Sequence, residues 1–213
     1  MWRRWARLRN RRWRVTDMAL DRLGLQKSSL LDYPGRVAAV VFTHGCPLRC
    51  PYCHNGELIS GPIPAGFVTR AEVMDHLRRR RALLGGVVIT GGEPLMHADL
   101  PQLIAEVGAI GLPVKIDTCG AYPDRLQEIL AMPEVDHVAL DIKTAPEHYD
   151  RVRGNGTDLL RTIRILRDST TSYHFRTTIA PDVVTDEDLT SIAALIEPGD
   201  TWVRQPYRAP VPA

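Results

Sequence analysis

The sequence predicts an α/β fold, a partial (β/α)6 barrel that is TIM-like, and three observations lead to this prediction. Six short apolar runs rich in β-branched residues alternate with five segments whose apolar residues recur at helical spacing. Such alternation is typical of a parallel sheet with right-handed crossovers. The runs are almost wholly apolar, as in strands covered on both faces. Finally, 213 residues are enough for one domain of this kind.

The elements follow one another in a regular order. Predicted strands occupy residues 37–43, 87–90, 114–118, 137–142, 173–179 and 201–205. Predicted helices occupy residues 69–84, 97–110, 122–131, 156–169 and 185–197. Each helical segment has acidic or hydroxyl side chains near its start, where free backbone N–H groups favour them. The "DYPG" of residues 32–35 predicts a turn before the first of these strands.

Polar residues gather where the predicted strands end. The first strand runs into "THGC", the second into "TGGEP", the third into "DTCG" and the fourth into "DIK". The fifth carries Arg176, and the sixth ends at Gln205. The carboxyl ends of the strands form one rim in a β/α barrel, and active sites lie on that rim. The sequence therefore predicts a site at the rim of a barrel that is open along one side.

Charge is distributed unevenly along the chain. The formal net charge is +2, yet residues 1–16 hold seven arginines, three tryptophans and no acidic residue. Residues 17–213 are therefore mildly acidic, and we predict that they form the core domain. We expect residues 1–16 to be a disordered basic extension, or to lie before a true start at Met18. We expect no membrane association and no specific nucleic-acid site, and we interpret the run Arg78–Arg81 as a solvated helix surface.

Three of the four cysteines, Cys46, Cys50 and Cys53, fall within eight residues in "CPLRCPYC". This spacing lets one loop surround one metal centre. A zinc site would need His54 as its fourth ligand, although adjacent side chains rarely converge on one tetrahedral ion. An electron-transfer iron–sulfur cluster normally takes four thiolates, and Cys119 is the remaining cysteine. A cluster held by three thiolates would leave one iron open for a ligand, which explains the number three.

Several motifs together resemble a known family. "CPLRCPYC" is similar to the C-x3-C-x2-C loop of the radical S-adenosylmethionine (SAM) superfamily, and "GGEP" (91–94) resembles its SAM-binding turn. The stretch "KSSLLDYPGRVAAVVFTHGCPLRCPYCHNGEL" (27–58) resembles activating enzymes of glycyl radical enzymes. Within that group it is most similar to the anaerobic ribonucleoside-triphosphate reductase activating proteins. "DTCG" and "DIKTAPEHYDRVRG" fit the same group, and the resemblance covers residues 25 to about 205.

The resemblance implies two cofactors and the residues that hold them. Cys46, Cys50 and Cys53 would bind three irons of one [4Fe–4S] cluster, and SAM would chelate the fourth iron. The fold implied is the partial barrel of the radical SAM type. Larger relatives carry auxiliary clusters on extra cysteines, but residues 54–86 contain no cysteine, so one cluster is expected.

Rim residues would bind SAM itself. Gly91 and Gly92 would let the backbone approach the cofactor, and Glu93 would accept from its amino group. Lys143 would pair with the SAM carboxylate, and Tyr52 would lie near the adenine. 

Three further polar residues at the strand ends have two possible roles. Asp117, Thr118 and Asp141 would either contact ribose or amine directly or help hold a monovalent cation against the SAM carboxylate. Two neighbouring residues receive structural interpretations. Cys119 stands where the family has Asn and is expected to be a small buried residue, and Asn55 is expected to cap the helix that follows it.

The implied activity is that of a radical SAM oxidoreductase acting on a protein. It would reductively cleave SAM to a 5′-deoxyadenosyl radical and install a glycyl radical on a partner enzyme, foremost an anaerobic ribonucleoside-triphosphate reductase. A low-potential flavodoxin or ferredoxin would supply the electron, and the location would be cytoplasmic. The alternatives are activation of a pyruvate formate-lyase-type enzyme and a small-molecule reaction like that of 7-carboxy-7-deazaguanine synthase. A simple ferredoxin-like electron carrier would need neither "GGEP" nor "DIK".

Overall fold

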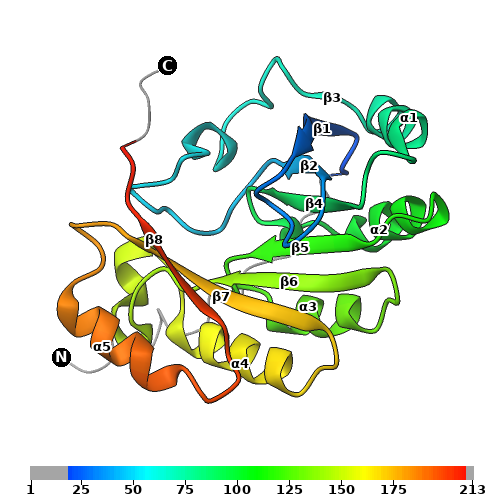
Figure 1. Ribbon diagram of the computed structural model, residues 1–213. Helices are drawn as coiled ribbons and strands as arrows, with labels where there is room; N and C mark the ends of the chain where they lie inside the picture. The colour runs from blue at the N-terminus through cyan, green and yellow to red at the C-terminus, as the bar shows by residue number, and fades with distance from the viewer. Residues whose placement is uncertain (1–18, 210–213) are drawn as a thin grey trace.

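An eight-stranded sheet forms the centre of the protein, and its strands run in the spatial order β3-β1-β2-β4-β5-β6-β7-β8 (Figure 1). The computed structural model describes residues 19–209, so the predictions for residues 1–16 lie outside the described residues. In chain order the strands are β1 (Arg22–Ser29), β2 (Ala38–Thr43), β3 (Val68–Thr69), β4 (Gly86–Gly91), β5 (Val114–Thr118), β6 (Val135–Asp141), β7 (Ser172–Ile179) and β8 (Trp202–Pro206).

The six predicted strands correspond to β2 and β4–β8, and all neighbours among them pair in parallel. This confirms the predicted partial (β/α)6 barrel. Two strands, β1 and β3, were not predicted. β1 pairs antiparallel with β2, and β3 pairs antiparallel with β1. Half of the residues of β1 are exposed, and the strand includes a glycine, so its sequence lacks an apolar run. β3 is only two residues long, too short to leave a pattern.

Five α-helices connect the parallel strands: α1 (Arg70–Arg80), α2 (Leu100–Ala109), α3 (Pro123–Leu130), α4 (Gly156–Arg167) and α5 (Asp186–Leu195). Short 3-10 helices lie at Gly56–Leu58 (η1), Pro94–Met96 (η2) and Pro146–Val152 (η3). Helix α1 begins at a capping box in which Thr69 and Glu72 satisfy each other's backbone N–H groups. It ends four residues earlier than predicted. Arg78 to Arg81 are exposed, as predicted for a solvated run.

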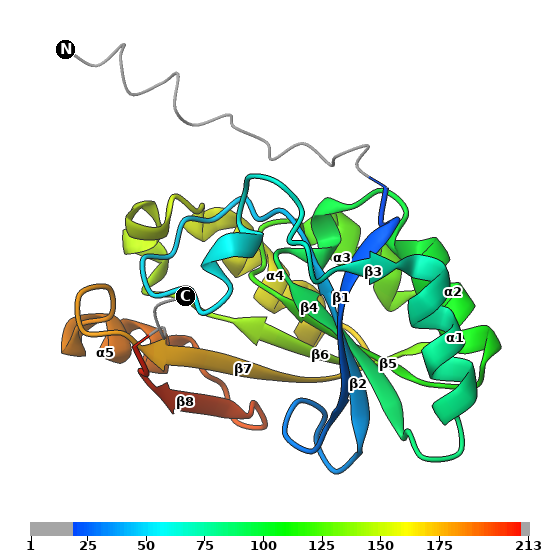
Figure 2. The same cartoon turned by 90° about the horizontal axis from the view of Figure 1, so that it is seen from above.

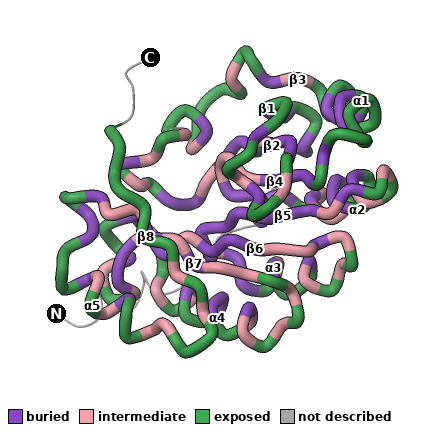
Figure 3. Tube along the Cα trace, in the orientation of Figure 1, coloured by how far each residue is buried: buried purple, intermediate pink, exposed green. Residues whose placement is uncertain are grey.

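The helices cover one face of the sheet, which is the outer face of the partial barrel (Figure 2). Apolar side chains of the covered face are buried together with the apolar stripes of the helices, as Figure 3 shows along the central strands. Representative members are Val87, Ile89, Ile116, Leu140 and Phe175. All five residues of β5 are buried, so both of its faces are covered as expected, whereas β6 and β7 also contain half-buried residues. Polar side chains on the inner face of these strands line the cavity described below.

The "DYPG" segment forms the predicted turn between β1 and β2. The Arg36 N–H donates to the Tyr33 carbonyl at 3.2 Å, and Gly35 takes a φ of 70°, which favours glycine. The turn folds Tyr33 onto the inner face of the sheet, beside Ala38 and Val88. There the Tyr33 hydroxyl group donates to the Asp136 carboxylate at 3.0 Å. The Tyr33 ring therefore packs over the beginnings of β2 and β4.

A buried carboxylate ties the segment after β6 to α5. Asp188 is completely buried, and its oxygens contact His148 Nδ1 at 2.5 Å and an Arg151 guanidinium nitrogen at 2.6 Å. The same carboxylate accepts from the backbone N–H of Thr185 in the capping box of α5. The connection positions η3, which directly follows the rim residues of β6. Asp188 is therefore an anchor for the rim.

We predict that Asp188→Ala lowers the free energy of unfolding by about 2 kcal/mol, because it removes the capping box of α5 and the contacts to His148 and Arg151. Chemical denaturation monitored by circular dichroism measures this change. Asp186→Ala, an exposed acid in the first turn of the same helix, is the matched control and should change stability by less than about 0.5 kcal/mol. Equal effects of the two substitutions would show that Asp188 is not an anchor.

Candidate active site

A cavity of about 340 Å³ lies at the carboxyl ends of the parallel strands, below the loop that carries the three cysteines. Its walls come from both the loop and the rim. They include Cys46, Cys50, Cys53, Asp117, Asp141 and Lys143. Residues distant in sequence thus meet where the sequence predicted a site.

The cysteine loop, residues 44–55, has no helix or strand of its own, so backbone contacts with its surroundings hold it. The N–H of Gly45 donates to the Leu58 carbonyl at 2.7 Å, and the N–H of Cys46 donates to the Ile59 carbonyl at 3.1 Å. Farther along, the N–H of Arg49 donates to the Val152 carbonyl at 2.9 Å. The loop is therefore fixed both to η1 and to η3.

The three cysteines of this loop are half-buried and influence one another's ionisation. Burial raises the pKa of the Cys50 thiol to about 11, against the opposing charge of Lys143. The pKa of Cys46 is lowered because the Cys119 thiol donates a hydrogen bond to it. Within residues 19–209 no three His, Cys, Asp or Glu side chains converge on a single metal-ion position. A cluster does not require that convergence, since each thiolate binds a different iron.

The two glycines of "GGEP" allow a close contact within the protein that was not predicted. A Cβ on Gly92 would lie 2.1 Å from the carbonyl oxygen of Gly45, and one on Gly91 would lie 2.7 Å from backbone atoms of Thr43. Gly91 also takes a φ of 103°. The absence of side chains therefore lets the cysteine loop pack on the end of β4. Both glycines still line the cavity, so their predicted contact with SAM stays a prediction.

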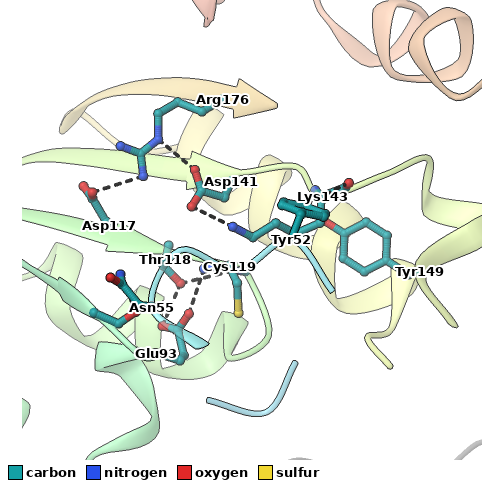
Figure 4. Close-up of polar contacts among 12 residues, drawn as sticks. Tyr52, Asn55, Glu93, Asp117, Thr118, Cys119, Asp141, Lys143, Tyr149 and Arg176 are labelled. Atoms are coloured by element: carbon teal, nitrogen blue, oxygen red, sulfur yellow. Dashed lines mark hydrogen bonds and ion pairs between the residues drawn. The ribbon is translucent and has the colours of Figure 1, made fainter. Parts of the chain in front are cut away.

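Glu93 is completely buried at this junction. Its carboxylate accepts from the Leu95 N–H at 3.0 Å, the Thr118 hydroxyl at 2.9 Å and the Cys119 N–H at 2.7 Å. Burial raises the pKa of Glu93, and these hydrogen bonds oppose that rise. The side chain therefore joins the ends of β4 and β5 (Figure 4). Its predicted acceptance from the SAM amino group stays a prediction.

A row of alternating charges crosses the rim from β5 to β7. Arg176 donates to Asp117 at 3.0 Å and to Asp141 at 2.7 Å, and Lys143 donates to the other oxygen of Asp141 at 2.9 Å (Figure 4). The strand register causes this, because Arg176 lies directly opposite Asp141. Lys115 completes the row through its ion pair with Asp117. Arg176 was predicted as a residue of the fifth strand but was not among the predicted site residues.

The pairing keeps these groups ionised although they are largely buried. Burial opposes ionisation of Asp141, yet Arg176 and Lys143 lower the pKa of its carboxyl group well below the usual range. Burial likewise opposes the charge on Lys143, and Asp141 raises the pKa of its ammonium well above normal. The cavity therefore presents a fixed ammonium group next to the cysteine loop.

Two loop residues link the cysteine loop to the rim. The Tyr52 hydroxyl donates to the Lys143 carbonyl at 3.2 Å, and its ring lines the cavity. Its predicted position near adenine stays a prediction. Asn55 was expected to cap the next helix, but it makes no side-chain capping bond. Its amide instead donates to the Gly91 carbonyl at 3.5 Å, a long contact that spans the loop and the turn.

Fold and cavity together define a class: a partial β/α barrel whose rim pairs a three-cysteine loop with a charged, glycine-rich turn. The model of the radical SAM superfamily matches residues 40–196. This chain belongs to the radical SAM superfamily and to its glycyl-radical enzyme activating group, and it is an oxidoreductase-type enzyme.

Two curated relatives illustrate the group. A Methanocaldococcus jannaschii protein, named provisionally as a glycyl-radical enzyme activating enzyme, is 31% identical over 192 residues, which cover 86% of this chain and 78% of that protein. The pyruvate formate-lyase-activating enzyme of Listeria monocytogenes is 32% identical, with coverage of 78% and 72%.

Solved structures share the fold at low identity. Streptococcus suis SuiB bound to S-adenosylmethionine aligns with a TM-score of 0.60 at 11% identity, over 78% of this chain and 39% of SuiB. The structure of anSMEcpe with bound AdoMet aligns with a TM-score of 0.57 at 16% identity, over 79% of this chain and 50% of that chain. This chain thus spans two fifths to one half of these larger proteins.

The family uses one [4Fe–4S] cluster with three cysteine ligands, together with SAM. The donor set here fits both groups. Three thiols line one cavity, and a cationic Lys143 faces the same space, where it suits a carboxylate. In residues 19–209 the structure has no helix long and apolar enough to cross a membrane.

We predict that Gly92→Ala destabilises the fold by about 3 kcal/mol, because its methyl group would overlap the Gly45 carbonyl. Anaerobic reconstitution should then bind less iron per chain, since the cysteine loop is displaced. A thermal melt and an iron assay measure the two effects. Gly66→Ala is the matched control, because a Cβ at that exposed position meets nothing within 4 Å. Full iron loading of Gly92→Ala would contradict this account.

Proposed function

We propose that this protein activates an anaerobic ribonucleoside-triphosphate reductase by installing a glycyl radical on it. The observation that carries the proposal is that the cysteine loop, the two glycines of "GGEP" and the Asp141 and Lys143 side chains of "DIK" line one cavity. The choice of reductase rests on the resemblance of residues 27–58. Identity of 32% to a pyruvate formate-lyase-activating enzyme favours a pyruvate formate-lyase-type partner as the second candidate.

The cysteine loop would hold the cluster. Cys46, Cys50 and Cys53 each supply one thiolate, and the loop stays in place through its backbone contacts with η1 and η3. Half-burial of these side chains would limit access of water and oxygen to the metal.

The rim would bind and orient SAM. The Lys143 ammonium pairs with the SAM carboxylate as a point charge, and Asp141 holds that ammonium in place. Tyr52 forms an apolar wall against the adenine. Bound together, the cluster and SAM supply a 5′-deoxyadenosyl radical that takes a hydrogen atom from glycine. The open side of the barrel leaves room for a loop of the partner enzyme.

A low-potential flavodoxin or ferredoxin would supply the electron. The cysteine loop offers the shortest route, because Arg49 and His54 beside the cluster ligands are exposed. A small electron carrier can therefore approach the loop from solvent.

We predict that the anaerobically reconstituted chain, with reductant and SAM, forms 5′-deoxyadenosine and generates a doublet in the electron paramagnetic resonance spectrum of a co-incubated reductase. Chromatography measures the first product. A doublet only on a pyruvate formate-lyase would support the second candidate. An intact cluster that forms no 5′-deoxyadenosine would contradict both.

Two cysteine variants are the controls for this experiment. Cys50→Ser should abolish the cluster, whereas Cys119→Ser should retain about four irons per chain and full 5′-deoxyadenosine formation. The second control is needed because Cys119 lines the cavity and its thiol contacts Cys46. Loss of the cluster in Cys119→Ser would make Cys119 a fourth ligand and exclude an open iron.

We predict that Lys143→Ala weakens SAM binding at least about tenfold, equal to about 1.4 kcal/mol, while iron content stays unchanged. The reason is loss of the ammonium that faces the SAM carboxylate. Isothermal titration of SAM into reconstituted protein measures the dissociation constant. Lys27→Ala, at an exposed position on β1, is the matched control and should bind SAM as the wild type does. Wild-type affinity in Lys143→Ala would remove this role.

A further inference from the structure

Lys115 is a buried ammonium group for which the proposed mechanism has no use. It lies on β5, only 1% exposed, and is among the largest fully buried side chains of the described residues. Its Nζ atom forms an ion pair with Oδ1 of Asp117, a carboxylate that is itself 8% exposed. Burying an ammonium costs several kcal/mol unless a close counter-charge offsets it. The burial of the Lys115 ammonium next to Asp117 therefore calls for an explanation.

The oxygens of Asp117 and Asp141 already have cationic partners. Asp117 contacts Lys115 through Oδ1 and Arg176 through Oδ2. Asp141 contacts Arg176 through Oδ1 and Lys143 through Oδ2. Three positive side chains thus surround two carboxylates.

This arrangement does not fit the monovalent cation that the family resemblance suggested. Such an ion needs several oxygen ligands, and each oxygen of both carboxylates already contacts a positively charged side chain. The Thr118 hydroxyl oxygen, the other suggested ligand, already accepts from the Gly120 N–H at 3.1 Å. A further cation would also meet three neighbouring positive charges at short range.

We propose that the Lys115 ammonium is a built-in counter-cation for Asp117, so that this chain binds SAM without a dissociable Na⁺ or K⁺ ion. Lys115 is thus a positioning residue, since it acts on the SAM cavity through Asp117. The inference rests on the proposed function in one respect, namely that SAM binds in this cavity.

The choice of side chain supports the proposal. The whole chain has three lysines against 24 arginines, and two of the three lysines, Lys115 and Lys143, flank the two rim carboxylates. A lysine ammonium is a compact point charge, more similar to an alkali ion than a planar guanidinium is.

The two nearby histidines do not supply this positive charge in place of Lys115. Burial and the charge of Lys115 lower the pKa of His137, and burial and Arg176 lower the pKa of His174 to about 4.

The test is SAM binding by the full chain with its cluster reconstituted, without reductant, in NaCl, KCl or choline chloride at one ionic strength. We expect wild-type dissociation constants that agree within twofold in the three salts. Lys115→Met should bind at least tenfold more weakly in choline and regain affinity in NaCl or KCl, because an ion can then approach Asp117. Lys27→Met is the matched control at an exposed position.

The outcomes separate the two proposals. Wild-type binding that falls tenfold or more in choline overturns the counter-cation, and this arm needs no variant to fold. Lys115→Met that binds like wild type in every salt overturns it as well. If Lys115→Met binds SAM more weakly by the same factor in all three salts, Lys115 has only a structural role, and the counter-cation proposal is overturned. Absence of wild-type SAM binding in every salt, with four irons per chain, overturns the proposed function itself.

Discussion

The contact between the end of β4 and the cysteine loop is the constraint on which the site depends. Two backbone hydrogen bonds form it: Gly92 N–H donates to the Thr43 carbonyl, and Glu93 N–H donates to the Gly45 carbonyl, both at 2.8 Å. Only glycine at position 92 permits this approach, because a Cβ would occupy the place of the Gly45 oxygen. Since β2 and β4 are parallel neighbours, the loop that follows one strand must meet the turn that follows the other. The metal ligands are thereby fixed to the sheet without a helix or strand of their own.

Electrostatics then shape the cavity that this contact closes. Burying charged side chains is unfavourable, so each one at the rim has a partner: Glu93 accepts from backbone and hydroxyl donors, and Asp141 pairs with Arg176 and Lys143. A fully paired network is rigid, because any movement would leave a buried charge unsatisfied. It offers both signs of charge to one small space, which suits a ligand such as SAM that carries an ammonium, a carboxylate and a sulfonium. The helices on the far face bear most of the apolar core, so the inner face is free to be polar.

Much of this arrangement follows from local pattern. Most of the six parallel strands could be predicted because they are short runs rich in apolar and β-branched residues, and Cys119 could be predicted as buried because free cysteine behaves as a small apolar residue. Other features could not. β1 has three consecutive exposed residues, 26–28, and a bulged register, so its sequence lacks a strand pattern. Asparagine is a residue type typical of helix N-caps, but the side-chain amide of Asn55 donates to the Gly91 carbonyl instead. Arg176 resembles any arginine within a strand until the register places it between two aspartates.

The sequence by itself determined the chemistry: three cysteines at C-x3-C-x2-C spacing, a "GGEP" turn and a "DIK" strand end specify the cofactor class, because ligand type and local spacing are written along the chain. Only the tertiary structure decided which charged groups that are distant in sequence form ion pairs. Lys115 and Asp117 lie two residues apart, so their side chains share a face of β5, but pairing with Arg176 across the sheet depends on strand register. The contact of the Cys119 thiol with Cys46 depends likewise on which strand ends are neighbours. Such long-range relations arise from packing and register, and no single segment of sequence encodes them.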